Sequence, residues 1–586
     1  MASHSSVDTS SVREEATARI HSKTIICLVA VNFIYVAQLS SVIGSGFLAN
    51  SMSQVVGGVE QTVWYSSCIT IMTVVLNPPI GQAADYWGRK PILVALPLTG
   101  IVGSIIVSRA HSSSALIAGF AILGVNFGCQ SVLLAVMSEV LPRRYRPMGQ
   151  ASGSIAASIG AILGLLMGGG LLQDGNLSNY RIYWYVEAGI YALATVGCFV
   201  GYNPPPRDLQ VSLNMSQKLR KLDWVGYSLF APALVLFSIA LSWSDNPYSW
   251  SSAHILGPFV IGVITMILFV IYEWHFKKGG MLHHDLWRNR NFTISLFVIF
   301  VEGISFFSAN SYFAFQITLI YDASILSAGA NFAIMFITGL VFSPVFGLWS
   351  SKRKSIRPPL LVGSILLLVF FVLLATVKID TPRYAFWIFP ILSGIALVSI
   401  VPLSMVSAQL ATTPELIALT SALMTAVRSF GGAVGLAIDN AVLNSTLEKE
   451  LPKKIGAAAL SLGLPPSSLP ALINALASQS RDAVKAVPGI SPEIAQAAVE
   501  AMKRAYLVAF RNAWIVSAAF CGLLVISTCF IKEQKADFDK RIDAPVEGEL
   551  VSLEGNESLS PANMQESVDK HDNAKAEMNH QEDSRV

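Results

Sequence analysis

The sequence has little charge. Asp, Glu, Lys and Arg make up only 13% of its 586 residues, whereas 53% are hydrophobic and the mean hydropathy is +0.55. Because soluble domains carry about 25% charged residues, this chain has too little polar surface to coat a water-soluble globule. Its net charge is only +3, and the basic residues form short clusters rather than one broad face. Nucleic acid is therefore excluded as a partner.

Cysteine is also scarce. The six cysteines all lie in apolar segments, where a thiol packs as a small apolar side chain. The sequence therefore predicts neither a disulfide framework nor a metal site. The nearest approach to a metal cluster is His283-His284-Asp285, but adjacent side chains diverge and no further ligand cluster accompanies them.

Catalytic motifs and a cleavable leader are missing. The chain has no HExxH, GxSxG or phosphate loop, so we expect no enzyme activity and no cofactor. Residues 1–22 are polar and do not form the charged start and short apolar core of a signal peptide. The first apolar run is therefore expected to act as a signal anchor.

Long apolar runs are abundant. A bilayer core of about 30 Å needs about 20 apolar residues in a helix. Continuous helices are expected because lipid offers no partner to an unpaired backbone amide. By this length criterion we predict fourteen spans, at residues 24–44, 58–80, 91–109, 115–138, 149–172, 182–201, 224–243, 254–274, 292–314, 327–349, 359–377, 384–407, 416–440 and 510–531.

The spans divide the chain into parts. Residues 1–23 form a tail, and six spans follow in residues 24–201. Residues 202–291 form a linker with two extra spans, and residues 292–531 hold the last six. Within them, residues 441–509 alternate Ala-rich stretches with prolines, which predicts an external loop with short amphipathic helices. The polar tail 532–586 is predicted to be disordered.

Lys and Arg set the expected orientation. They gather in alternate short loops, for example at Arg89 and Lys90 and at Arg143, Arg144 and Arg146. Basic residues are retained on the cytoplasmic side of a membrane. Both termini are therefore predicted to be cytoplasmic, as an even number of spans requires, and we expect a monomer in the plasma membrane.

The strongest motif lies between the second and third spans. It reads Gly81-Gln-Ala-Ala-Asp85-Tyr-Trp-Gly88-Arg89-Lys90. The glycines allow a tight turn, and Asp85 suits the N-terminus of the following helix. This pattern resembles the signature loop of the major facilitator superfamily, in which the loop gates the cytoplasmic face. The resemblance implies that Asp85 and Arg89 engage nearby charges, for which Glu139 and Arg143 are the candidates.

Further motifs narrow the family. Lys221-Leu-Asp-Trp224-Val-Gly226 opens the seventh span, Tyr272-Glu273-Trp274 ends the eighth, and Arg428-Ser-Phe-Gly431-Gly432-Ala-Val-Gly435 lies in the thirteenth. Together they resemble fourteen-span fungal transporters, nearest to the trichothecene efflux pump family, with drug–proton antiporters and siderophore transporters as relatives. Over about residues 24–531, the resemblance implies an all-α major facilitator fold of two six-helix bundles plus two extra helices.

Two positions depart from the proton-driven relatives. The fifth span resembles the antiporter signature, but Leu165 stands where that signature places proline. In the fourth span, Phe120 stands where drug–proton antiporters often carry arginine. If protons drive transport, another group must carry the coupling.

Two ionisable residues are expected near the membrane midplane, where charge is costly and usually functional. At 1.5 Å per residue, Glu302 lies about 15 Å into the ninth span and Arg428 about 18 Å into the thirteenth. We predict that Glu302 loads and releases a proton and that Arg428 tunes it. A static buried pair that only orients helices is the open alternative.

Amides and aromatic rings predict a substrate cavity. In the superfamily that the chain resembles, the first and fourth spans of each half line the central cavity. The amides and aromatic rings of the corresponding spans in this chain suit a bulky, mostly apolar organic molecule. Ordinary helix packing explains any one of these residues taken singly. These residues are Asn32, Gln38, Asn126, Gln130, Phe306, Asn310 and Phe313.

Three functions remain open. The first is proton-coupled efflux of a small organic toxin, drug or secondary metabolite by alternating access, with protons and the lipid bilayer as the other partners. The second is import of an iron–siderophore chelate, and the third is a non-transporting membrane sensor. External glycosylation sequons begin at Asn176 and Asn444, of which Asn444 lies farther from the predicted bilayer.

Overall fold

The fold is built from long helices. The computed structural model describes residues 22–58, 61–206, 208–243, 251–277, 279–323, 325–477, 486–544 and 546, and in these residues it contains helices and no strand. Among them, thirteen helices are long and apolar enough to cross a membrane. A further helix, α4 (Val63–Trp87), has 25 residues and coincides with the remaining predicted span. The predicted all-α membrane fold is confirmed.

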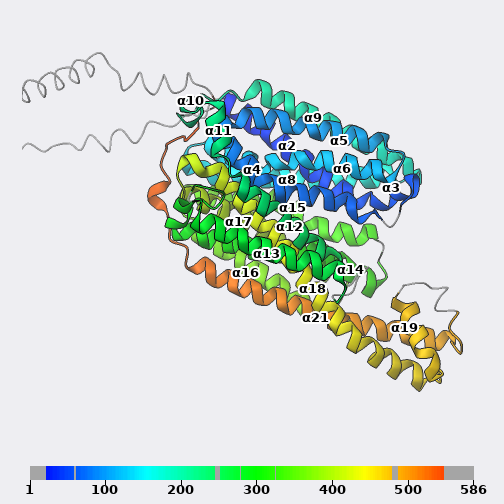
Figure 1. Cartoon of the computed structure of the whole chain (residues 1–586). Coiled ribbons are helices and arrows are strands. Elements are labelled where there is room, and N and C mark those ends of the chain that lie inside the picture. The colour runs from blue at the N-terminus through cyan, green and yellow to red at the C-terminus, as the bar shows by residue number, and fades with distance from the viewer. Residues whose placement is uncertain are drawn as a thin grey trace, which may run out of the picture.

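The N-terminal part forms one bundle (Figure 1). The short helix α3 (Ala49–Val56) follows its first member. Besides α4, the bundle consists of α2 (Ser22–Phe47), α5 (Arg89–Arg109), α6 (Ser113–Asn126) continued by η3 (Phe127–Cys129) and α7 (Gln130–Glu139), α8 (Arg146–Leu171) and α9 (Tyr180–Gly201).

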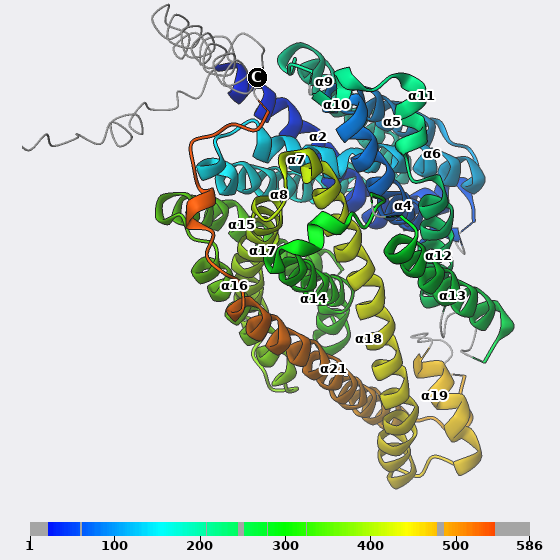
Figure 2. The same cartoon turned by 60° about the vertical axis from the view of Figure 1, so that its left-hand side comes forward.

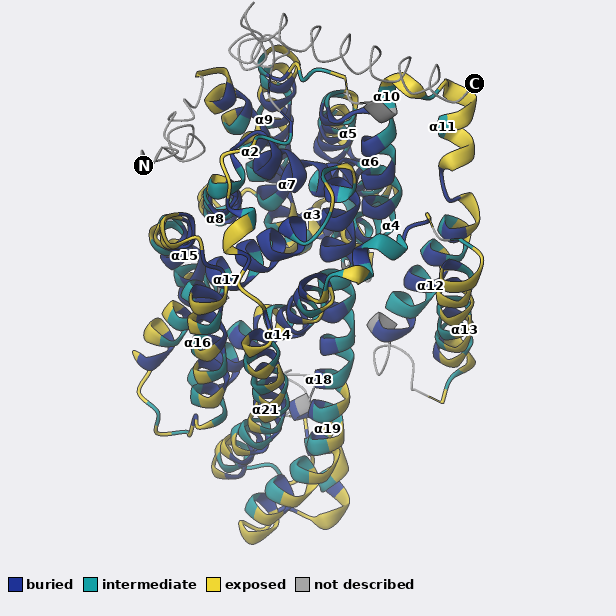
Figure 3. Cartoon of the chain, turned by 90° about the vertical axis from the view of Figure 1, so that its left-hand side faces the viewer, coloured by how far each residue is buried: buried dark blue, intermediate teal, exposed yellow. Residues whose placement is uncertain are grey.

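The C-terminal part forms a second bundle, which lies against the first (Figure 3). It consists of α14 (Arg290–Tyr321), α15 (Ile325–Arg353), α16 (Arg357–Ala375), α17 (Ala385–Leu410), α18 (Ile417–Ser461) and α21 (Pro492–Cys529). Between the bundles in sequence are α10 (Asp208–Ser212), α11 (Met215–Lys221), α12 (Trp224–Trp243), α13 (Ala253–His275) and η6 (His284–Arg288). Helices α12 and α13 pack on each other, and α12 also contacts α4 and α18 (Figure 2).

The fourth span is interrupted where we predicted a continuous helix. A 3₁₀ turn at η3 leaves backbone groups without helical partners. Asn77 of α4 replaces them, because its Nδ2 donates to the Phe127 carbonyl at 3.2 Å and its Oδ1 accepts from the Ser131 amide at 2.9 Å. In lipid such freed groups must be satisfied by a neighbouring helix, so a side chain 50 residues away in the sequence stabilises the break.

The last two spans are longer than predicted. Helix α18 has 45 residues and α21 has 38, which correspond to about 68 Å and about 57 Å. They extend well past the rest of the bundle and carry α19 (Leu469–Ala477) between them (Figure 1). Much of residues 441–509 therefore continues two membrane helices instead of forming separate short ones. Their contacts continue the hydrophobic core of the C-terminal bundle.

Candidate functional site

The gate loop, residues 81–90, is organised around one buried arginine. Arg89 is only 2% exposed, and its Nη2 donates to Asp85 at 3.1 Å and to Glu139 at 2.7 Å. Gly88 supplies the positive φ of 94° that turns α4 into α5. Gly81 lets α4 approach α18 closely, because a Cβ there would lie 2.7 Å from that of Ala422. The gate loop thereby fixes α4, α5 and α7 together and brings them against the second bundle.

The other basic residues of this face have different partners. Lys90 donates to Asn203 Oδ1 at 3.3 Å and lies 5.3 Å from the centre of the Phe199 ring. Arg143, which we expected to face the gate loop, instead donates its Nη2 to Asp543 at 3.0 Å. Asp543 lies in the tail that we predicted to be disordered. The described part of that tail is ordered and contacts both bundles.

Removal of the central arginine tests the gate network. Arg89→Ala leaves Asp85 and the fully buried Glu139 without this cation. Breaking a buried ion pair by deleting one partner costs about 3–5 kcal/mol, so we expect a clear fall in the melting temperature of the detergent-purified protein. Lys90→Ala removes a more accessible charge and is the matched control, with an expected cost of at most about 1 kcal/mol. Equal melting temperatures for the two variants contradict this account.

Glu302 and Arg428 meet, as their expected depths suggested. Arg428 Nε donates to Glu302 Oε2 at 2.6 Å, and its Nη2 donates to Oε1 at 3.0 Å. The carboxylate side chain is 3% exposed and the guanidinium side chain 25% exposed. Arg428 also lies 4.8 Å from the centre of the Phe306 ring. This two-point ion pair joins α14 and α18 inside the membrane-spanning region.

Glycines make this meeting possible. A Cβ on Gly303 would overlap the carbonyl of Arg428, and one on Gly431 would overlap the carbonyl of Phe300. A Cβ on Gly435 would lie 2.8 Å from the Ile304 Cα. The backbones of α14 and α18 are therefore in direct contact, as small residues at this spacing permit in membrane helices. The close crossing aligns the carboxylate with the guanidinium.

The ion pair also faces the first bundle. Tyr35 of α2 lies near enough to interact electrostatically with both Glu302 and Arg428, and Gln130 of α7 lies beside its hydroxyl. A change in the charge of Glu302 is thus felt by a helix of the opposite bundle. Neither the sequence spacing nor the motifs singled out Tyr35.

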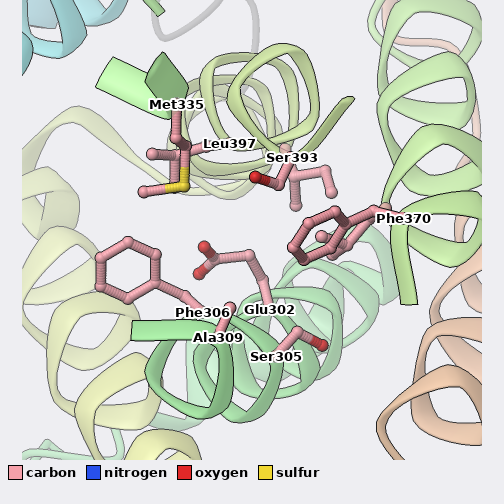
Figure 4. Close-up of a pocket in the computed structure, with 10 residues that line it drawn as sticks. Glu302, Ser305, Phe306, Ala309, Met335, Phe370, Ser393 and Leu397 are labelled. Atoms are coloured by element: carbon pink, nitrogen blue, oxygen red, sulfur yellow. The ribbon is translucent and has the colours of Figure 1, made fainter. Parts of the chain in front are cut away.

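A small cavity adjoins Glu302 (Figure 4). It lies among α14, α15, α16 and α17, and Glu302, Phe306, Met335, Phe370 and Ser393 are among its lining residues. Its volume of about 20 Å³ holds about one water molecule. Pockets for drug-sized ligands occupy about 300–1,000 Å³, so this cavity suits a water or a proton path and not the substrate.

The predicted cavity amides of the N-terminal bundle are held by other helices. Asn32 donates to Ser152 Oγ at 3.0 Å, which ties α2 to α8. Gln38 donates to the Asn126 carbonyl at 3.2 Å, at the break in the fourth span. Asn126 is fully buried, and its Oδ1 accepts a hydrogen bond from Cys129 Sγ at 3.7 Å. These amides lie at the interior of the bundle, where they stabilise helix contacts.

The predicted cavity residues of α14 point in different directions. Phe306 lines the cavity beside Glu302, and Asn310 is exposed. Phe313 is fully buried and packs against Phe332, at 5.8 Å between ring centres, within the core of the C-terminal bundle. The structure therefore does not gather the three on one surface.

Other carboxylates are buried outside the predicted site, among them Glu187, which the sequence placed near enough to the membrane surface for contact with water. Glu187 is fully buried in α9 and accepts hydrogen bonds from Ser40 and Ser41 of α2. Asp223 and Glu273 are buried together where α12 begins and α13 ends, and their carboxyl groups are within hydrogen-bonding reach. The unusual burial of these acids depends on helix contacts, so no local sequence signal identified it.

Comparisons with known proteins identify relatives that are membrane transporters. The profile of the family described as fungal trichothecene efflux pump (TRI12) matches residues 10–550. The trichothecene efflux pump TRI12 of Fusarium sporotrichioides is 25% identical over 82% of this chain and 81% of its own length. The multidrug transporter protein MdtP of Bacillus subtilis is 22% identical over 87% of this chain and 94% of its own.

Solved structures show the same fold. The human organic anion transporter MFSD10 aligns with a TM-score of 0.52 at 12% identity, covering 86% of this chain and 99% of its own. The proton:xylose symporter XylE, a major facilitator superfamily protein, aligns with a TM-score of 0.51 at 11% identity over 89% of this chain and 97% of its own. At such low identity the likeness establishes the major facilitator fold.

Proposed function

The chain belongs to the fungal trichothecene efflux pump family, and from that membership we propose that it exports a small organic molecule in exchange for protons. The observation that carries the proposal is the two-point pair of Glu302 and Arg428 within the membrane-spanning region. A carboxylate there is costly to keep charged, and Arg428 offsets that cost. Protonation of Glu302 weakens the pair, so proton binding is linked to the contact between α14 and α18.

The closed gate fits a mechanism of alternating access. Helices α8 and α15 pack along each other, and Ser343 of α15 donates to the Ala151 carbonyl of α8 at 2.8 Å. Gln409 of α17 likewise donates to the Leu134 carbonyl of α7 at 3.4 Å. These contacts join the two bundles on the face that carries the gate loop. Rocking of one bundle against the other breaks them and opens that face.

An export assay tests the proposal. Purified protein is reconstituted in proteoliposomes and supplied with a trichothecene or the dye rhodamine 6G. We expect uphill movement when a pH gradient is imposed, and loss of that movement when a protonophore collapses the gradient. If the transport rate does not change with the pH gradient, the proposal of proton coupling is wrong. If neither compound is moved, the proposal that the protein exports such molecules is wrong. Growth on an iron chelate as the sole iron source tests the import alternative.

The proposed location is the plasma membrane, with both termini in the cytoplasm and the protein as a monomer. The gate-loop face is then cytoplasmic, because it carries Arg89, Lys90 and the arginines after α7. In this orientation the loop after α8 and the projecting ends of α18 and α21 are external.

Glycosylation reports on this orientation. Asn176 is exposed in a turn, where its Oδ1 accepts from the Ser178 amide, whereas Asn444 lies within α18. Because sequons are modified in accessible loops, we expect Asn176 to be the better acceptor, the reverse of the preference from sequence. Asn176→Gln should remove a glycosidase-sensitive shift in gel mobility, and Asn444→Gln should change it less. Modification at Asn214, on the gate-loop side, contradicts the orientation.

A further inference from the structure

The chain beyond the last span crosses from one bundle to the other. It leaves α21 beside α16 and reaches the N-terminal bundle (Figure 2). We call residues 533–546 the tail strap; the structure describes all of them except residue 545. The strap includes η9 (Lys535–Asp537) and runs over the gate-loop face.

One end of the strap is fixed to the C-terminal bundle. Glu533 accepts hydrogen bonds from Ser355 Oγ at 2.8 Å and from the Ile356 and Arg357 amides at 3.2 Å each. It thereby caps the N-terminus of α16, where a carboxylate also interacts favourably with the helix dipole. Phe538 is 1% exposed and belongs to the hydrophobic core of that bundle.

The other end is fixed to the N-terminal bundle. The Asp543 side chain is fully buried and binds Arg143 and Arg146, of which Arg146 is itself 1% exposed. Arg143 contributes Nε at 3.1 Å and Nη2 at 3.0 Å, and Arg146 contributes Nη2. Charge-assisted hydrogen bonds of this kind are about twice as strong as neutral ones.

Backbone hydrogen bonds add to this anchor and connect it to the gate. The Arg143 amide donates to the Arg541 carbonyl and the Arg144 amide to the Asp539 carbonyl, both at 3.0 Å. The Ala544 amide donates to the carbonyl of Glu139 at 3.1 Å. Glu139 is the residue whose side chain holds Arg89 of the gate loop.

We propose that the tail strap is a releasable lock on the gate. The strap joins Arg143 and Arg146, at the beginning of α8, to the beginning of α16. The two bundles therefore cannot separate on this face until Asp543 leaves these two arginines. The group that binds Arg143 and Arg146 is thus the carboxylate of Asp543, a residue of the same chain. The strap goes beyond the proposed export function, because it sets how often the gate opens whatever the substrate.

Cysteine labelling of the full-length protein in detergent tests the lock. A reporter cysteine at Ser343, which is buried between α15 and α8, is introduced with Cys68 and Cys529 replaced by serine. We expect Asp543→Asn to make maleimide labelling at this position faster by about tenfold or more, because the open population rises as the strap is released. The matched control is Asp539→Asn, whose exposed carboxylate lies 3.9 Å from Arg143, and it should leave the rate unchanged.

The melting temperature and a second variant of Asp543 distinguish release of the strap from unfolding of the protein. Equal labelling rates for Asp543→Asn and the parent at equal melting temperature overturn the proposal. If Asp543→Asn also lowers the melting temperature, Asp543→Glu decides, because glutamate keeps the negative charge that Arg143 and Arg146 bind. Restored slow labelling supports a lock by ion pairing, and continued fast labelling overturns it. The assay needs no substrate or pH gradient, so its outcome is independent of the export assay.

Discussion

Replacement of Glu302 by glutamine is expected to abolish the part of transport that a pH gradient drives. Glutamine keeps the size of the side chain and an oxygen that accepts from Arg428, but it cannot bind and release a proton. Movement of rhodamine 6G down its own concentration gradient should persist, because the helix crossing is kept. Initial rates in proteoliposomes, measured with and without an imposed pH gradient, give the two components separately.

The control for this variant is Glu415→Gln, which removes an exposed carboxylate from the turn Pro414–Leu416. It should retain the full response to the gradient. An unchanged response in Glu302→Gln at normal protein levels removes Glu302 from the coupling role and favours the static pair. Glu302→Ala should in addition lower stability by about 1–3 kcal/mol, because Arg428 then loses its partner in the membrane.

Gly303→Ala is expected to lower both the stability of the protein and its response to a pH gradient. The added methyl group would overlap the Arg428 carbonyl, which belongs to the backbone of α18 and cannot swing away. The helices α14 and α18 must separate, at a cost of about 1–3 kcal/mol or more for overpacking. The separation also lengthens the contacts between Glu302 and Arg428. We expect a marked fall in melting temperature together with a weaker response to the pH gradient.

Substitution of a second glycine is the matched control, and it should change the melting temperature in the opposite direction or not at all. Gly329 lies in α15, and a Cβ there would meet nothing within 4 Å. Alanine is favoured over glycine inside a helix by about 1 kcal/mol, so Gly329→Ala should leave the melting temperature unchanged or raise it. A Gly303→Ala protein as stable as the parent shows that α14 and α18 can move apart without cost, which contradicts the close crossing.

The sequence by itself determined the helices and the family. Whether a segment spans a bilayer depends on the length and polarity of that segment, which are local properties. For the same reason, the rise per residue placed Glu302 and Arg428 at matching depths, and the structure pairs them. The resemblance of residues 81–90 to the signature loop implied that Arg89 engages a charge at a neighbouring helix end, with Glu139 as one of two candidates, and the structure pairs Arg89 with Glu139. The roles of these residues in transport remain predictions.

Only the tertiary structure decided which distant groups meet. Arg143 lies 400 residues before Asp543, and no local pattern shows that the chain returns across the gate-loop face. The break at Asn126 is possible because Asn77 of another helix supplies the missing hydrogen bonds. Phe313 has the same spacing from Glu302 as a cavity residue needs, yet it packs among the rings of its own bundle. Partners of this kind depend on the path of the whole chain, because a side chain's neighbours come from other helices.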